Sequence, residues 1–509
     1  MKGDFSRNTF DPHKHFTRVL MQQGRVQLDA DWNEQAAILL HYLRSLAADL
    51  IGPHGGPSDD DCGFKIEPNR DKDFEIGFGR YYVEGILCES DEPLAYTAQP
   101  QWPISEAEKL EEGQDYLVYL DVWERHITHI EDPNIREVAL GGPDTATRAQ
   151  VVWQVKVLPV EGGEDENEEQ IAALQQELEE LYARLETATD PAPIKAKIED
   201  IQRQLEQLQE RRAPSAARCE KLLHEKLDEL GQLTESSLRA QAYVESPSED
   251  ACITPPEARY RGAENQLYRV EIHTSGKAWD GEENTKPTAA TFKWSRDNGS
   301  VVAAWLGQEG ENLIVSGVRD RRRSFAAGQW VELTHDEREL RGEPGAMVQV
   351  VKAEADRVTI DPETASDDVS WSDKLKNPKV RRWDHEATRT TELSSGAVPV
   401  RESTIEKPKW LDLEDGIRIM FEAEGEDHLY RTGDYWLIPA RTATGDVEWP
   451  KERDEDGELK RDAEKNPIPK ALPPHGVEHH YAPLAIISVG DGGVKEETDC
   501  RRRFEPLAR

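Results

Sequence analysis

Apolar residues recur at steps of three and four positions close to the N-terminus, which is the spacing of one face of an α-helix. The positions are Trp32, Ala36, Leu39, Leu40, Leu43, Ala47 and Leu50. Asp29 or Asp31 is suited to cap this helix, and Gly52-Pro53 ends it. An amphipathic helix must bury its apolar face, so we expect it to pack either on its own domain or on a neighbouring subunit.

From about residue 63 the pattern changes to short, β-branched and aromatic runs that predict strands. Residues 81–88 predict a tight hairpin around Glu84-Gly85, and the Asn298-Gly299 pair predicts a second one. Further runs predict strands at 116–123, 151–158, 267–273, 290–294, 301–305, 330–333, 347–351, 358–360, 417–421, 435–439 and 484–489. The regular spacing between about 290 and 365 is typical of a small barrel.

The middle of the chain carries two heptad-spaced apolar series separated by a turn that contains two prolines. The first series is Ile171, Leu174, Leu178, Leu181 and Leu185, and the second is Ile194, Ile198, Ile201, Leu205 and Leu208. Charged residues and glutamines fill most positions between them. Two such series of similar length predict an antiparallel coiled-coil hairpin over about 165–212, with a third helix after it.

Together these patterns predict a mainly β, multi-domain protein with short-strand barrels or sandwiches, an N-terminal helix and the inserted coiled coil. The predicted domains are an assembly segment with the amphipathic helix (1–57), the first part of a β domain (58–164), the coiled-coil hairpin with its following helix (165–240), the continued β domain (241–310), a small barrel-like module (311–365) and a C-terminal β-rich domain with long loops (366–509).

Charge and composition restrict the partners. The 101 acidic and 63 basic residues give a net charge of −38, which disfavours binding to nucleic acid and to anionic membranes. Basic triplets occur at 321–323 and 501–503, but isolated triplets usually pair with nearby carboxylates. The chain shows neither an N-terminal secretory signal nor an apolar run that could span a membrane, so we expect synthesis in the cytoplasm. Five scattered cysteines, an odd number, argue against a disulfide framework.

The sequence contains no motif that would identify a catalysed reaction. It contains no nucleophile-elbow, phosphate-loop or zinc-protease motif, and the clustered histidines His475, His479 and His480 lack the company of a metal site. We therefore predict no catalytic residue, metal or cofactor, and no enzymatic activity. Five tryptophans, outside the strand patterns, are candidates for an interface or a glycan platform: Trp32, Trp371, Trp383, Trp410 and Trp449.

The opening MKGDFSRNTFDPHKHFTRVLMQQGRVQLDADWNEQ resembles an uncharacterised family of phage-tail-like proteins that occurs beside baseplate genes of contractile injection systems. The stretches YLVYLDVWERH (116–126), LGGPDTATRAQVVWQV (140–155), FKWSRDNGSVV (292–302), GDYWLIPAR (433–441) and HHYAPLA (479–485) resemble it too. The resemblance implies a structural or attachment component of a tail-like particle, in its baseplate or tail fibre, and supplies no catalytic residues.

From this resemblance we expect other particle subunits as partners and a homo-oligomer, with a trimer favoured because tail-like particles are built on three-fold and six-fold axes. We expect assembly in the cytoplasm and release with an extracellular particle. The alternative from a different class is a glycan-binding or glycan-cleaving effector that such a particle carries to a cell-surface glycan.

Overall fold

In the computed structural model, strands are the predominant secondary structure of the described residues. The described residues are 1–58, 62–69, 72–102, 104–105, 108–160, 174, 177–178, 181–182, 197–198, 200–204, 216–231, 236–243, 259–317, 324–387, 392–422, 428–462 and 466–505. The fold is mainly β and contains several sheets, as predicted, and it has an N-terminal helix.

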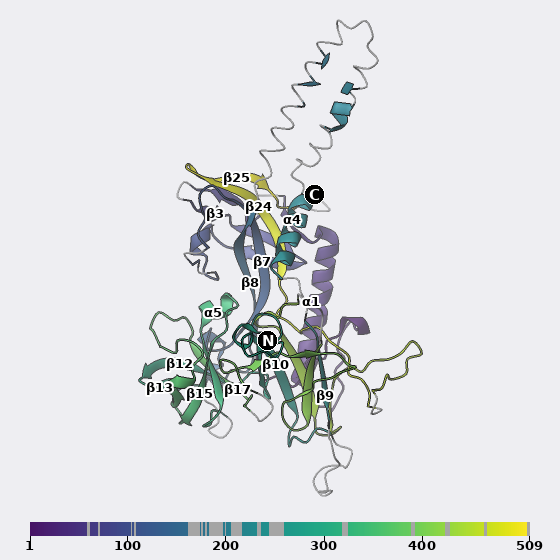
Figure 1. Ribbon diagram of the computed structural model, residues 1–509, viewed down its shortest axis with the longest axis vertical. Coiled ribbons are helices and arrows are strands. Elements are labelled where there is room, and N and C mark those ends of the chain that lie inside the picture. The colour runs from purple at the N-terminus through teal and green to yellow at the C-terminus, as the bar shows by residue number, and fades with distance from the viewer. Residues whose placement is uncertain are drawn as a thin grey trace. The chain divides into compact units, whose positions relative to one another are not determined.

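The predicted N-terminal helix is α1 (Asp29–Ile51), which Figure 1 shows in purple. Among the described residues, the later helices with defined bounds are α4 (Ala216–Glu229) and α5 (Asp336–Leu340). None of the helices in the described part of the chain has both the length and the apolar character needed to cross a membrane.

The chain forms two compact units, and each is built from three separate segments. Unit 1 consists of residues 1–43, 123–152 and 228–479, and unit 2 of residues 44–122, 153–227 and 480–509. The helix α1 and the two long strands β7 (Asp115–Ile127) and β8 (Arg148–Val160) continue from one set of segments into the other. The sequence predicted a β domain that is interrupted once, by the coiled-coil insert, whereas both units of the structure are assembled from three separate segments.

Two sheets of unit 1 share one hydrophobic core and form a sandwich. The first has the order β18 (Val398–Pro399), β11 (Thr291–Ser295), β10 (Gln266–Thr274), β22 (Tyr435–Arg441) and β23 (Asp446–Val447), and the second contains β19 (Glu402–Ser403), β21 (Ile417–Glu422), β20 (Leu411–Asp412) and β9 (Leu238–Ala242). Tyr268, Phe292, Ile419 and Trp436 are among the buried side chains of this common core. The alternating apolar positions of β10 and β22 therefore fill the space between the two sheets.

Unit 1 also contains a closed six-stranded barrel. Its strands in order are β12 (Val302–Glu309), β13 (Asn312–Ser316), β16 (Arg357–Asp361), β15 (Ala346–Ala353), β14 (Trp330–Thr334) and β17 (Lys379–Trp383). Figure 1 labels four of them in teal and green. The barrel begins before and ends after the predicted module at 311–365, because β12 and β17 are needed to close it.

Unit 2 is built on three sheets. They contain β26 (Arg503–Phe504), β1 (His54–Pro57), β4 (Gly79–Val83) and β5 (Ile86–Ser90); β2 (Ile66–Pro68), β3 (Phe74–Ile76) and β6 (Leu94–Ala95); and β25 (Gly493–Asp499), β24 (His480–Gly490), β7 (Asp115–Ile127) and β8 (Arg148–Val160). The strand β24, in yellow in Figure 1, lies beside the blue β7 although they are far apart in the sequence.

One of the two predicted hairpins is confirmed. The strands β4 and β5 pair in antiparallel fashion around Glu84 and Gly85, which both have positive φ. A Cβ on Gly85 would lie 2.2 Å from the backbone oxygen of Arg44 on α1, so glycine is required both for the turn and for the approach of the helix.

The hairpin predicted at Asn298-Gly299 is wrong. Both residues adopt the positive φ of a tight turn, but β11 joins the five-stranded sheet and β12 joins the barrel, so the two strands do not pair. The Asn298 side chain instead donates to the backbone oxygens of Met1 and Gly3 at 3.1 and 2.9 Å. Contacts with the distant N-terminus thus replace the local strand pairing.

The predicted coiled-coil hairpin lies largely outside the described residues.

One disulfide joins Cys219 and Cys500, which are 281 residues apart in the sequence. Cys62 and Cys88 are free, and Cys252 lies outside the described residues. The odd number of cysteines argued against a disulfide framework, but it is compatible with this single bridge.

Candidate functional site

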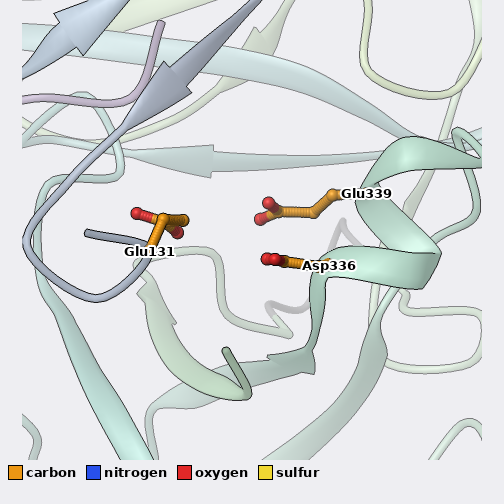
Figure 2. Close-up of side chains that lie close together, drawn as sticks. All are labelled: Glu131, Asp336 and Glu339. Carbon is orange, nitrogen blue, oxygen red and sulfur yellow. The ribbon is translucent and has the colours of Figure 1, made fainter. Parts of the chain in front are cut away.

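Three carboxylates of unit 1 converge in the manner of a metal site. Figure 2 shows Asp336 and Glu339 of α5 pointing toward Glu131, which belongs to the turn after β7. One oxygen of each carboxylate lies within 4.8 Å of the others. The geometry alone would allow an ion with hard oxygen ligands to bind.

Two basic side chains already occupy this cluster. Arg125 donates to Asp336 at 2.5 Å and to Glu339 at 2.9 Å, and Lys379 contacts Glu131 and Glu339. Burial would raise the pKa of Glu131 and Glu339, but the adjacent Lys379 ammonium lowers both below the usual value. The cations take the position that a metal would need, so the residues present fit a structural ion-pair cluster rather than a metal site.

A second group of acidic side chains lines a cavity of about 160 Å³ in unit 1, which we call the acidic pocket. Its polar lining consists of Arg296, Asp384, Glu386, Asp412 and Glu414, and its apolar wall of Phe292, Trp294, Val398, Leu411 and Leu413. Sites for drug-sized ligands are larger, about 300–1,000 Å³. The acidic pocket therefore has room for a small ligand or for one end of a longer one.

Glu414 gives the acidic pocket a group that titrates near neutral pH. Its carboxylate accepts from the Tyr268 hydroxyl at 2.9 Å and from Arg296 at 2.7 Å. Burial raises the pKa of Glu414 to about 7, although Arg296 and the Tyr268 hydroxyl oppose that shift. Asp384, whose side chain is fully buried, also faces Arg296, at 3.8 Å. A carboxyl group that titrates near pH 7 beside a second carboxylate is suited to proton transfer.

The interior of unit 1 also holds a network of charges between the five-stranded sheet and the barrel, which we call the buried charge network. Lys293 of β11 lies 2.6 Å from Glu332 of β14 and 3.4 Å from Glu271 of β10. Lys2 lies 2.9 Å from Glu271, and Arg269 lies 2.5 Å from it. The first residues of the chain therefore lie in the interior of unit 1.

Most of the exposed large apolar side chains in the described residues belong to the N-terminal segment. Of the 21 exposed large apolar side chains in the described residues, 12 lie between positions 16 and 50: Phe16, Leu20, Met21, Val26, Leu28, Trp32, Leu39, Leu40, Tyr42, Leu43, Leu46 and Leu50. The helix α1 buries only Ala30 and Ile38. It therefore leaves its leucine-rich face to solvent, the reverse of a normal surface helix.

The five tryptophans singled out from the sequence do not form one surface. Trp383 is fully buried and donates to Glu332 at 2.9 Å, and Trp449 is 5% exposed, so these two belong to the core of unit 1. Trp410 is half-buried with the Arg418 guanidinium 4.8 Å from its ring centre. Trp32 and Trp371 are exposed, by 69% and 36%. The structure thus leaves only the latter two open as contact surfaces.

Sequence reasoning did not identify the acidic pocket. Phe292, Trp294 and Arg296 lie in one quoted stretch of the resemblance, but Asp384 and Glu414 come from distant loops. With 101 acidic residues no pair could be selected by spacing. The alternation of apolar and acidic residues at 411–414 is the one local signal, since it places both carboxylates beside the turn at Asp415-Gly416.

Comparison with known proteins places the chain in a family but not beside a characterised protein. No curated protein and no solved structure matches it. A model of a family of unknown function, DUF6519, matches residues 1–508 and thus nearly the whole length. The chain belongs to this family of unknown function.

Proposed function

We propose that the protein is a non-catalytic structural or attachment subunit of a larger, phage-tail-like contractile injection particle, and that its N-terminal segment is the assembly element. The observation that carries the proposal is the exposed apolar face of α1 and of the residues before it. Large apolar side chains that are exposed together in one segment are typical of interaction sites. The resemblance of the N-terminal stretch to phage-tail-like proteins indicates the kind of particle. It also implies assembly in the cytoplasm and release in an extracellular particle.

The side chains before α1 support docking on a neighbour, because they are held in place without being covered. The backbone N–H of Val19 donates to Gln35 at 2.9 Å, and the Thr9 hydroxyl donates to Glu34 at 2.6 Å. Phe16 and Leu20 nevertheless remain exposed, by 56% and 70%. A segment ordered in this way presents its apolar groups with little further loss of conformational entropy on binding.

The predicted coiled-coil hairpin is part of this proposal, as a projection from a β-rich body. Leu181 packs against Ile198 and Ile201, which belong to the second heptad series. Lys197 lies 2.6 Å from Glu177, also across the two series. These contacts support antiparallel pairing of the two arms over about 165–212.

Purification of the particle from the native host, with identification of its proteins by mass spectrometry, tests the proposal. We expect the chain to sediment with the particle, and Phe16→Ser/Leu20→Ser/Met21→Ser to abolish incorporation without changing the thermal transition. Leu306→Ser/Val351→Ser, which changes exposed side chains of the barrel, is the matched control and should incorporate normally. Recovery of the wild-type chain only as a free soluble protein would contradict the proposal.

The acidic pocket favours a second candidate function, glycan binding or cleavage by an effector carried on such a particle. Its supporting feature is Glu414, titrating near pH 7 beside Asp384 and the aromatic side chains of Phe292 and Trp294. Glycosidases use two carboxyl groups of this kind, one of them with a raised pKa. Release of reducing ends from cell-surface glycans by the wild type but not by Glu414→Gln would support it. Loss in the exposed control Glu309→Gln as well, or no release by either protein, would count against it.

A further inference from the structure

The exposed residues of α1 form a regular heptad seam. Trp32, Ala36, Leu39, Leu43, Leu46 and Leu50 follow one another at steps of four, three, four, three and four residues, and all six are exposed. This is the repeat of the a and d positions of a coiled coil, extended over nearly three heptads. At 1.5 Å per residue, the seam is roughly 27 Å long.

We propose that a second copy of this chain covers the seam, so that α1 helices from different copies pack together as a coiled-coil bundle. The proposal rests on the proposed function, which requires an assembly surface, and it names the partner for that surface.

The seam lies away from the side of α1 that the chain itself covers. Ala30 and Ile38, the buried residues, occupy b and c positions of the same heptad. The f positions also contact the chain: the ring of His41 lies 5.7 Å from the ring of Phe10, and Glu34 accepts from the Thr9 hydroxyl. Gln35, at a g position, also accepts from the backbone N–H of Val19, and Asp29 in the first turn accepts from that of Ser6. The six seam positions from Trp32 to Leu50 nevertheless stay exposed and open to another helix.

The charge of the seam suits contact between identical chains. Each copy carries a net charge of −38, so two acidic surfaces would repel each other. The six seam positions carry no charge, and of the flanking e and g positions, Asn33, Gln35, Leu40, Tyr42, Ala47 and Asp49, only the last is charged. A basic partner would find few carboxylates to pair with along this face. A second copy would present the same nearly uncharged face, so the two faces would not repel each other.

The area available matches that of a stable interface. This area follows from the typical apolar surface of each side-chain type and its exposed fraction. The 12 exposed apolar side chains from Phe16 to Leu50 together offer on the order of 700–1,000 Å² of apolar surface per copy. A standard interface buries about 800 Å² per partner. Leu40 and Tyr42 widen the apolar face on both sides of the seam, and a wide face favours a bundle of three or more helices over a pair.

Light scattering after size-exclusion chromatography of the full chain, over a wide concentration range, tests the inference. We expect a wild-type mass that is a multiple of the monomer mass and a monomer mass for Leu43→Glu/Leu46→Glu. Both leucines are exposed, by 63% and 57%, so unchanged circular dichroism and thermal transitions should accompany the change in mass. The control Leu306→Glu/Val351→Glu adds the same charge at exposed barrel positions and should keep the wild-type mass.

A monomeric wild type at every concentration, or an unchanged mass for Leu43→Glu/Leu46→Glu, overturns the inference. If that monomeric chain still sediments with the particle, the proposed function stands and the seam binds another subunit. If the wild type self-associates through the seam but is absent from any particle, the inference stands and the proposed function fails.

Discussion

Replacing Lys293 by methionine should strongly destabilise unit 1. The Lys293 ammonium is 2% exposed, lies 2.6 Å from Glu332 and 3.4 Å from Glu271, and sits 4.6 Å from the centre of the Trp383 ring. Methionine retains most of the apolar volume but removes the positive charge. Glu332 would then keep only the Trp383 and Gly345 N–H groups as donors, at 2.9 and 3.1 Å.

The magnitude follows from two independent estimates. Removing one partner of a buried ion pair costs about 3–5 kcal/mol, because the other charge is left uncompensated. Burial would raise the pKa of Glu332, but the ammonium groups of Lys293 and Lys2 lower it from 4.5 to about 2. That shift corresponds to on the order of 3 kcal/mol of stability at pH 7 and sets an upper limit for the share of Lys293, because both ammonium groups contribute to it. We therefore expect Lys293→Met to lower the free energy of unfolding by about 3–5 kcal/mol at pH 7.

The same shift predicts the pH dependence. A carboxyl group with a depressed pKa in the folded state stabilises the protein above the pKa of the unfolded state, and this stability is lost as the pH falls through the folded pKa. For Glu332 the window lies between pH 4.5 and about 2. The stability difference between wild type and Lys293→Met should consequently narrow as the pH is lowered through this window.

Urea denaturation followed by tryptophan fluorescence measures the effect, because 11 of the 13 tryptophans lie in unit 1. We expect a midpoint lower by roughly 1–2 M urea. The control Lys352→Met removes an exposed lysine of the barrel that is paired with Glu354 at 2.6 Å, and it should cost less than about 1 kcal/mol. The double variant Lys293→Met/Glu332→Gln should recover part of the loss. A loss below about 1 kcal/mol for the single variant, or no recovery in the double variant, would refute this reasoning.

Three further predictions concern other parts of the molecule. Cys219→Ser should lower the thermal transition of unit 2 by opening a bridge across 281 residues, at a cost of up to about 5 kcal/mol, and a reductant should reproduce the effect on the wild type in scanning calorimetry. Burial raises the pKa of Glu414 to about 7, so its contribution to stability is present below pH 4.5 and lost as the pH rises through 7; relative to wild type, Glu414→Gln should gain roughly 1–2 kcal/mol between pH 5 and 8 in urea titrations, after a discount for partial exposure. Self-association should strengthen as salt is raised from low to physiological levels, since the net charge of −38 per copy is screened within about 8 Å, and weaker association by light scattering would indicate an interface held by opposite charges.

Local patterns predicted the elements well where local forces decide them. The α1 helix and the β4–β5 hairpin follow from apolar spacing and from a turn that glycine permits. At the Asn298-Gly299 turn, the local pattern predicted the backbone conformation but not the pairing of the strands. The backbone of the turn has the predicted conformation, but the strands beside it pair with partners distant in the sequence, and the Asn298 side chain bonds to the N-terminus. Turn chemistry fixes the local dihedral angles and leaves the choice of strand partner to the tertiary structure.

The candidate sites were less predictable, because burial and not residue type defines them. Glu332 and Glu414 are ordinary glutamates in the sequence, yet the pKa of the first is lowered by a buried lysine and that of the second is raised by burial in the acidic pocket. Trp383 and Trp449 lie in polar stretches but are buried: the buried Lys293 lies over the Trp383 ring, and the Trp449 indole N–H donates to the backbone oxygen of Lys470. A polar sequence context therefore did not indicate exposure.

In unit 1, charged side chains are buried between the five-stranded sheet and the barrel, which is the reverse of the usual distribution of polar and apolar residues. The strand β14 is buried along its whole length: Val331 and Leu333 fill the barrel, and Glu332 on the opposite face meets Lys293 of β11. Two β modules joined by apolar faces alone could slide past each other, whereas paired buried charges are satisfied in one register only. The cohesion of unit 1 thus depends on a polar interface, while α1 leaves its leucines in solvent. In this arrangement the apolar face of α1 is not needed to hold the chain's own fold together, and it remains available for another subunit.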